Sequence, residues 1–200
     1  MLSRSKISTS CRLGRRRFIL AALAFICVLF FLPAQVVRAE DQRFDEYQVK
    51  AAFLYNLTNF VFWPNNDFNT PSRPFVITLL GKDSFGVALD KIVAGEQVAS
   101  RPIEICRLQR IDELKPCQII FLSESFWSDP GELSRILDFA NRHNALTVGE
   151  SAAFLQRGGT VALIFRNNRV RVGINIAAAN RAGLQFSSKL LQVATIVGSE

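Results

Sequence analysis

Short apolar segments with the composition of β-strands alternate with helical patterns through most of this 200-residue chain, and the alternation ends in two adjacent strands. The predicted strands before that pair are residues 75–80, 103–108, 118–122 and 145–148. The pair itself, 160–165 and 169–174, flanks Asn167-Asn168, residues that accept the positive φ of a two-residue hairpin turn. This order predicts an α/β fold, namely a single-domain α/β sandwich with a mixed, partly antiparallel sheet flanked by helices.

Helices are predicted from apolar residues at helical spacing and from capping residues. Residues 45–63 form the first predicted helix, which Pro64 ends. Asp129 precedes Pro130 and is typical of a helix start, and Gly158 is typical of a helix end. The other predicted helices are residues 84–93, 129–142, 151–156, 176–182 and 187–197.

The amino-terminal segment has the pattern of a secretory signal peptide. Basic residues precede the 15-residue apolar run Phe18 to Leu32, and Pro33 and Val37-Arg38-Ala39 follow it. A membrane-spanning helix needs about 20 apolar residues, so a cleaved signal is favoured over a permanent anchor. We therefore expect residues 1–39 to be removed after Ala39. Arg15-Arg16-Arg17 leaves twin-arginine export open beside the general route.

The formal charge of +7 belongs to this predicted signal peptide. Residues 1–39 hold seven Lys and Arg and no acidic residue, which leaves 17 basic and 17 acidic residues in 40–200. The mature chain is therefore neutral overall, and its charge gives no support for nucleic-acid binding.

Two cysteines, Cys106 and Cys117, remain after the predicted cleavage. They lie at the end of one predicted strand and the start of the next, and exported proteins favour disulfides. We predict an intramolecular bridge that adds about 3 kcal/mol in the chain-entropy model. Two buried thiols or an intermolecular bond are the alternatives.

Three motifs with catalytic or ligand-binding associations are incomplete. Gly149-Glu150-Ser151 stands where a nucleophile elbow would, but no His or Asp follows Ser151. Gly81-Lys82 lacks the other positions of a phosphate-binding loop. His143 is the only histidine, so a zinc site would lack its ligands. We expect no enzyme, no cofactor and no metal, with Glu150 or Ser151 capping a helix and His143 near a helix end.

Two blocks of the sequence resemble the YfiR family. The first is Gly149 to Leu191, with its glycine-acid step, the Gly158-Gly159 pair, the Ile174-Asn175 step and a closing AGLxxSSKLL pattern. The second is Tyr47 to Pro64, which resembles the opening helix of the family and its Trp-Pro end. Asn59 and Phe62 depart from the pattern, because many relatives carry lysine and glutamate there.

The resemblance implies a periplasmic regulator, with residues 40–200 as a YfiR-like periplasmic domain. The implied partner is the periplasmic domain of an inner-membrane diguanylate cyclase, which the regulator binds and represses, so that cyclic di-GMP and biofilm formation fall. A homodimer stays open, and no nucleic acid is expected. The alternative is a periplasmic small-molecule-binding module or transport accessory protein. The residues that match the family pattern, and that we expect to contact the partner, are Glu150, Phe154, Ile174 and Leu184.

Two further groups admit a structural and a functional interpretation. Aromatic residues crowd the first helix, and they serve either the core or an interface with another chain. Phe154, Leu184 and Phe186 carry the same ambiguity. Arg166, Arg169 and Arg171 are either a solvated hairpin face or a contact for an acidic partner.

Overall fold

The structure, a computed structural model, describes residues 34–64 and 73–198. Contacts divide the chain into two units, 1–44 and 45–200, and the strands described for this chain all lie in the second unit. Most of the predicted signal peptide lies outside the described residues, and helix α2 (Ala34–Phe60) runs through the predicted cleavage site. Cleavage after Ala39 therefore stays a prediction. Within the described part, no helix is long and apolar enough to cross a membrane.

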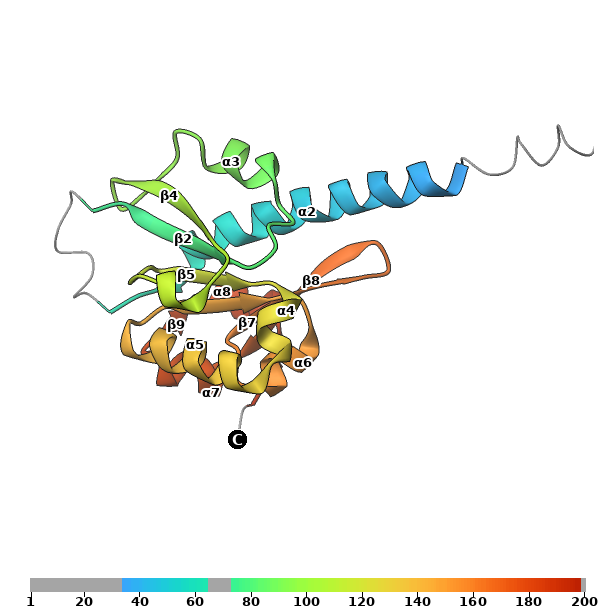
Figure 1. Cartoon of the computed structure of the whole chain (residues 1–200). Coiled ribbons are helices and arrows are strands. Elements are labelled where there is room, and N and C mark those ends of the chain that lie inside the picture. Colours follow the sequence, from blue (N-terminus) through green and yellow to red (C-terminus); the bar gives the residue numbers. More distant parts are fainter. Residues whose placement is uncertain (1–33, 65–72, 199–200) are drawn as a thin grey trace, which may run out of the picture. The chain divides into compact units, whose positions relative to one another are not determined.

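An eight-stranded mixed sheet forms the centre of the second unit (Figure 1). Its strand order is β10-β8-β7-β6-β5-β2-β4-β3. The pairs from β4 across to β7 are parallel, as is β10 with β8, whereas β7 with β8 and β3 with β4 are antiparallel. The strands are β2 (Phe75–Leu80), β3 (Gln97–Val98), β4 (Arg101–Leu108), β5 (Ile119–Leu122), β6 (Leu146–Gly149), β7 (Val161–Arg166), β8 (Arg169–Asn175) and β10 (Thr195–Val197). The predicted mixed α/β fold is confirmed.

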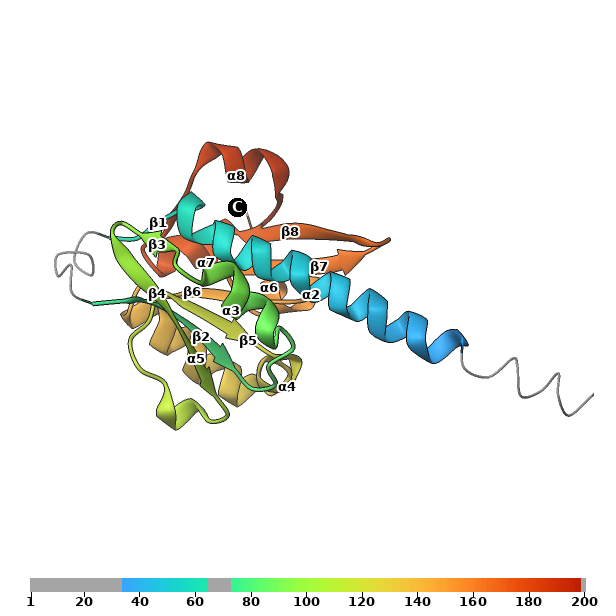
Figure 2. The same cartoon turned by 90° about the horizontal axis from the view of Figure 1, so that it is seen from above.

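Helices cover both faces of this sheet (Figures 1 and 2). On one face α2 and α3 bury Leu54 and Leu89 against the sheet, and on the other α5 and α6 bury Ile136 and Phe154. The short helices are α3 (Val87–Val93), η3 (Ile111–Glu113), α4 (Glu124–Ser128), α5 (Pro130–Arg142), α6 (Ala152–Gln156), α7 (Ile176–Arg181) and α8 (Ser188–Val193). As predicted, Asp129 caps α5, accepting a hydrogen bond from the Glu132 amide at 2.9 Å.

The order of the parallel strands places several loops together. The chain leaves β2, passes through α3 to β4 on one side, and then returns to β5 on the other side of β2. The carboxyl ends of β2, β5 and β6 therefore meet at one edge of the sheet, the edge where open α/β sheets place their functional loops. The loops after Leu80, Leu122 and Gly149 begin there.

Two predicted helices end earlier than their local patterns indicate. The helix predicted for 45–63 ends at Phe60, because β1 (Val61–Phe62) pairs antiparallel with β9 (Gln185–Phe186). The helix predicted for 187–197 ends at Val193, because β10 joins the edge of the sheet beside β8. Both corrections have the same cause: pairing with a strand distant in sequence overrides the local helical pattern.

Candidate functional site

The glycines of the carboxy-terminal block form a slot for one aromatic ring. A Cβ atom on Gly149 would lie 2.6 Å from the ring of Phe154, and one on Gly159 would lie 2.2 Å from it. Phe154 itself is fully buried in the core on the α5 and α6 face. The spacing of glycines and phenylalanine in this block is therefore a packing requirement, since any larger residue at either glycine would displace the ring.

Polar residues of the same block cap helices. The Ser151 hydroxyl accepts a hydrogen bond from the Phe154 amide at the start of α6. Asn175 Oδ1 accepts one from the Ala178 amide, while its amide group donates to the Leu155 carbonyl at 2.9 Å. Ser187 caps α8 in the same way. Of the two residues expected to cap α6, Ser151 has that role, and the apparent nucleophile elbow is a helix start.

Three of the four residues expected to contact the partner lie in the core. Phe154 and Ile174 are fully buried, and Leu184 is 1 % exposed. Their side chains cannot reach another protein while the domain is folded, so any effect that they have on binding passes through the fold. Glu150 alone is partly open to solvent, with 19 % of its side chain exposed.

Glu150 is the partner of a buried lysine on α2. Lys50, 3 % exposed, places its Nζ 2.6 Å from Glu150 Oε1, and it also forms an ion pair with Glu46 one helical turn earlier. Burial by itself lowers the pKa of Lys50, but the hydrogen bonds that its ammonium donates to Glu150 and Glu46 outweigh burial and raise the pKa above its ordinary value. The ammonium group is therefore charged at neutral pH, as a buried lysine between two carboxylates requires.

Tyr47 and Ser84 complete this group. The Lys50 ammonium lies 4.7 Å from the centroid of the Tyr47 ring, and the Ser84 side chain in the loop after β2 is near enough to the Tyr47 hydroxyl to affect its pKa. Burial raises the pKa of the Tyr47 phenol, Ser84 lowers it, and Glu150 raises it further. We call Glu46, Tyr47, Lys50, Ser84 and Glu150 the carboxyl-end cluster. It joins α2 to the loops after β2 and β6.

The chemistry available to the carboxyl-end cluster is that of recognition. Two carboxylates around one ammonium leave a net charge of about −1 at neutral pH. The side chains of Glu46 and Glu150 are more exposed to solvent than that of Lys50. Among the residues that the structure describes, no group of three His, Cys, Asp or Glu side chains is placed to hold a metal ion. The cluster can orient α2 and accept hydrogen bonds from a cationic or hydrogen-bond-donating group of another molecule.

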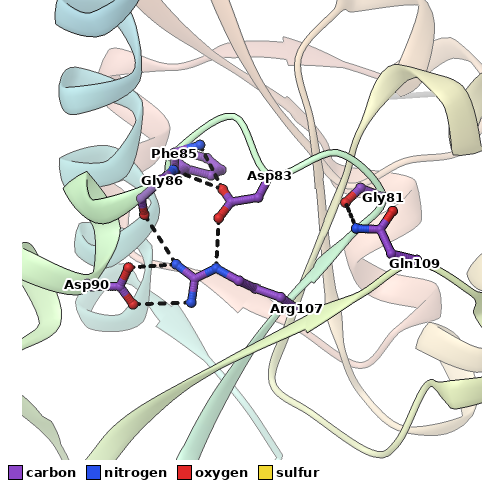
Figure 3. Close-up of polar contacts among 7 residues, drawn as sticks. All are labelled: Gly81, Asp83, Phe85, Gly86, Asp90, Arg107 and Gln109. Atoms are coloured by element: carbon purple, nitrogen blue, oxygen red, sulfur yellow. Dashed lines mark hydrogen bonds and ion pairs between the residues drawn. The ribbon is translucent and has the colours of Figure 1, made fainter.

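Arginine contacts fix the loop after β2 in place beside this cluster (Figure 3). Arg107, near the end of β4, donates to Asp83 at 2.7 Å, to both carboxylate oxygens of Asp90, and to the Gly86 carbonyl. Asp83 Oδ1 also accepts from the amides of Phe85 and Gly86, so α3 begins only at Val87. The Gly81-Lys82 segment is thus a structured turn between strand and helix.

The aromatic residues at the end of α2 divide between core and surface. Trp63 is buried, packs edge-on against Phe75 and donates its indole N–H to the Gln118 carbonyl. Phe53 and Phe60 are partly buried against the core. Phe62 is 57 % exposed, so it is the aromatic residue of this group that remains available to another chain.

Cys106 and Cys117 are free thiols in this structure. Cys106 of β4 pairs in register with Thr78 of β2, and Cys117 precedes β5, which pairs with β2 on its other side, so the two cysteines lie on opposite sides of this strand. Burial raises the pKa of the Cys117 thiol to about 12. The predicted disulfide stays a prediction.

The hairpin arginines and His143 take the positions that the sequence indicates. Arg166 lies opposite Arg169 in the β7–β8 ladder, and Arg171 follows on the same face, all three exposed. Asn167 and Asn168 form the turn with φ of 52° and 59°. His143 ends α5, where its amide donates to carbonyls of the last turn and its ring lies on Phe139.

Comparison with known proteins settles the family. The model of the YfiR/HmsC-like family matches residues 47–195, which include both blocks and every residue of the carboxyl-end cluster except Glu46. The chain belongs to the YfiR/HmsC-like family. Membership indicates a regulator of the diguanylate cyclase pathway from a periplasmic family of regulators rather than enzymes.

Other comparisons add little to this assignment. No curated protein matches the chain. Among solved structures, a conserved domain protein from Vibrio cholerae O1 biovar El Tor strain N16961 is similar at 14 % identity and a TM-score of 0.42. The match covers 61 % of this chain and 54 % of that one, so the chain corresponds to about half the length of that protein.

Proposed function

We propose that this member of the YfiR/HmsC-like family is a periplasmic protein that binds the periplasmic domain of an inner-membrane diguanylate cyclase and represses it. Repression lowers cyclic di-GMP and biofilm formation. The family match over residues 47–195 is the observation that supports this proposal most directly.

The meeting of the two family blocks supports a binding role. Lys50 of the opening block contacts Glu150 of the carboxy-terminal block, and Phe60 and Phe62 of the first meet Ser187 and Gln185 of the second. Five polar residues of the carboxy-terminal block serve as helix caps or form the hairpin turn, namely Ser151, Asn167, Asn168, Asn175 and Ser187. Carboxylates that remain partly exposed beside a buried charge are suited to orienting a bound protein.

One side of α2 offers apolar contact area next to those carboxylates. Glu46, Val49, Phe53 and Phe60 recur at helical spacing, and we call them the α2 stripe. Val49 is 45 % exposed, and Phe53 and Phe60 are partly buried. A row of apolar side chains with a carboxylate at one end has the composition of an interface with anchors and a polar rim. We infer that the partner covers the α2 stripe and the exposed ring of Phe62.

Deleting the gene tests the function. Cellular cyclic di-GMP and surface attachment are expected to rise in the deletion strain, and the rise is expected to disappear when the partner cyclase is deleted as well. Crosslinking of the exported protein in intact envelopes, followed by affinity purification, identifies that cyclase. Unchanged cyclic di-GMP in the single deletion across several growth conditions would contradict the proposal.

A further inference from the structure

Strand β4 has a long open edge. On one side, its residues 103–108 pair in register with β2. On the other side, β4 pairs with β3, which covers Arg101 and Pro102 and extends no further. The sheet ends at β3, so among the strands that the structure describes none lies beside residues 103–108 on that side. We call these residues the β4 edge.

Backbone groups along the β4 edge point alternately toward β2 and away from it. Leu108 accepts a hydrogen bond from the Gly81 amide at 2.8 Å, so its carbonyl points toward β2. Because this direction alternates along a strand, Ile103, Ile105 and Arg107 point their N–H and C=O groups outward. No backbone hydrogen bond from the described part of the chain reaches these outward groups. An extended backbone offers donors and acceptors at the matching interval of about 6.6 Å.

One face of the β4 edge is apolar. Ile103 and Ile105 are partly buried there against the core on the α2 and α3 side. Arg107, on the same face, donates to the Gly86 carbonyl just before α3 (Figure 3). Val87, the next residue, is 59 % exposed. Apolar side chains of an added strand would bury the outer sides of the two isoleucines.

The opposite face of the β4 edge presents a carboxylate. Glu104 lies between the two isoleucines in sequence and is exposed. It forms no ion pair with any residue that the structure describes. A basic residue on the same face of an added strand would be its cross-strand partner.

A second copy of this chain does not provide that partner. A two-fold dimer would pair the two β4 strands antiparallel, with outward-pointing residues opposite outward-pointing ones. The residue opposite Glu104 would then be one of the other alternate set, which is Pro102, Glu104, Cys106 and Leu108. None of these is basic, and a charge on an edge strand discourages pairing between identical edges.

We propose that the β4 edge binds an extended segment of another protein, which adds to the sheet as a further strand. The segment alternates basic and apolar residues, with a lysine or arginine beside Glu104 and apolar side chains beside Ile103 and Ile105. Backbone pairing supplies affinity, and the alternate side chains supply selectivity. Binding at this edge does not require that the other protein be a diguanylate cyclase.

Titration with synthetic peptides, combined with amide exchange of the purified protein followed by NMR, tests this site. The probes are peptides of about seven residues. One alternates lysine and valine, one alternates glutamate and valine, and one is the lysine peptide with N-methylated backbone amides. We expect saturable binding of the lysine peptide and slowed exchange of the Ile105 and Arg107 amides. The glutamate peptide is expected to bind more weakly, and the N-methylated peptide, which lacks backbone donors, is expected not to bind.

Charge variants connect the binding to the β4 edge. Glu104→Gln is expected to weaken binding of the lysine peptide about threefold. Glu104→Lys is expected to reverse the preference, so that the variant binds the glutamate peptide more tightly than the lysine peptide. Glu113→Lys, which reverses an exposed carboxylate on η3, is the matched control and is expected to leave the preference unchanged.

Several outcomes would overturn the site. They are absent binding of the lysine peptide, equal binding of its N-methylated form, unchanged exchange along the β4 edge, and the same shift in preference in both charge-reversal variants. Slowed exchange of the same amides at high protein concentration without peptide would assign the edge to a second copy, and would overturn the proposal as well.

Discussion

The Nζ atom of Lys50 lies 2.6 Å from a carboxylate oxygen of Glu150, although the two residues are 100 positions apart in the chain. This contact joins the opening helix to the loop after the central strand β6. It also decides how Glu150 must be probed. Replacing Glu150 by alanine removes one partner of a buried charge, so its effect on regulation is mixed with an effect on stability, and Glu150→Gln is the milder probe because it keeps an acceptor.

Lys50→Met is expected to lower the free energy of unfolding by about 3 kcal/mol, because Glu46 and Glu150 lose the ammonium that neutralises them. Urea unfolding at pH 7 measures the change. Lys91→Met is the matched control, since Lys91 is exposed on α3, and it is expected to stay within about 0.5 kcal/mol of the parent. An equal effect of both substitutions would contradict a stabilising role for the buried ion pairs.

The same lysine predicts a pH dependence. The pKa of Lys50 is raised in the folded protein, so its contribution to stability is complete below the ordinary lysine pKa of 10.5 and is lost as pH rises through the folded value. The difference in unfolding free energy between the parent and Lys50→Met is therefore expected to be constant from pH 7 to about pH 9 and to narrow above about pH 10.5. Urea unfolding across this range measures it. A gap that persists undiminished at pH 11 would show that the charge of Lys50 is not its cause.

Phe62→Ala is expected to change the free energy of unfolding by less than about 0.5 kcal/mol, because the ring is 57 % exposed. It is nevertheless expected to raise cellular cyclic di-GMP, because the protein would bind its partner cyclase more weakly. Phe75→Ala, in the core, is the comparison and is expected to cost about 3–5 kcal/mol. Thermal unfolding and cyclic di-GMP extraction from the same strains give both values. If a Phe62→Ala protein accumulates normally and still represses the cyclase fully, the partner does not bind at this ring.

Arg107→Ala is expected to lower stability by about 1 kcal/mol and to speed amide exchange in residues 81–90, whose loop it fixes (Figure 3). The effect is modest because 36 % of the Arg107 side chain is exposed and solvent screens its ion pairs. Arg107→Lys should restore little of the loop order, since an ammonium cannot replace a fork that contacts three residues. Unchanged exchange in 81–90 would show that Asp83 and its turn hold the loop unaided.

Thiol labelling tests the cysteines. If the predicted bridge forms on export, denatured and unreduced protein from the periplasm has no thiol to label, and the double change of Cys106 and Cys117 to serine lowers stability by a few kcal/mol at most. After reduction, Cys106 is expected to react first in the folded protein, because burial raises the pKa of Cys117 to about 12. Two free thiols per chain in exported protein would exclude the bridge.

Helix ends and turns that are marked by a capping or turn residue could be predicted from the sequence. Asp129-Pro130 locates the start of α5, Asn167-Asn168 the hairpin turn and Gly158 the end of α6, because each residue type satisfies a backbone requirement within a few positions. The matches of the sequence to the family were also correct, and the family model spans them.

The roles of residues in the candidate site could not be read in the same way. Phe154 matches the family pattern because glycines pack against it, and nothing in the one-dimensional pattern separates such a residue from one that binds a partner. The sequence near Lys50 does not indicate that this lysine is buried, because its partner Glu150 comes 100 positions later. The early end of α2 and the strand β10 depend likewise on pairing with distant segments.

Pairing of β1 with β9 also sets a condition on the order of folding. A chain that emerges amino end first presents Val61 and Phe62 long before Gln185 and Phe186, their antiparallel partners, are available. Until more than a hundred further residues have followed, Val61 and Phe62 at the end of the opening helix lack the strand that pairs with them. A newly made chain therefore passes through a stage in which the end of that helix is open to misassembly, and a holding chaperone would act there, before Gln185 and Phe186 have emerged.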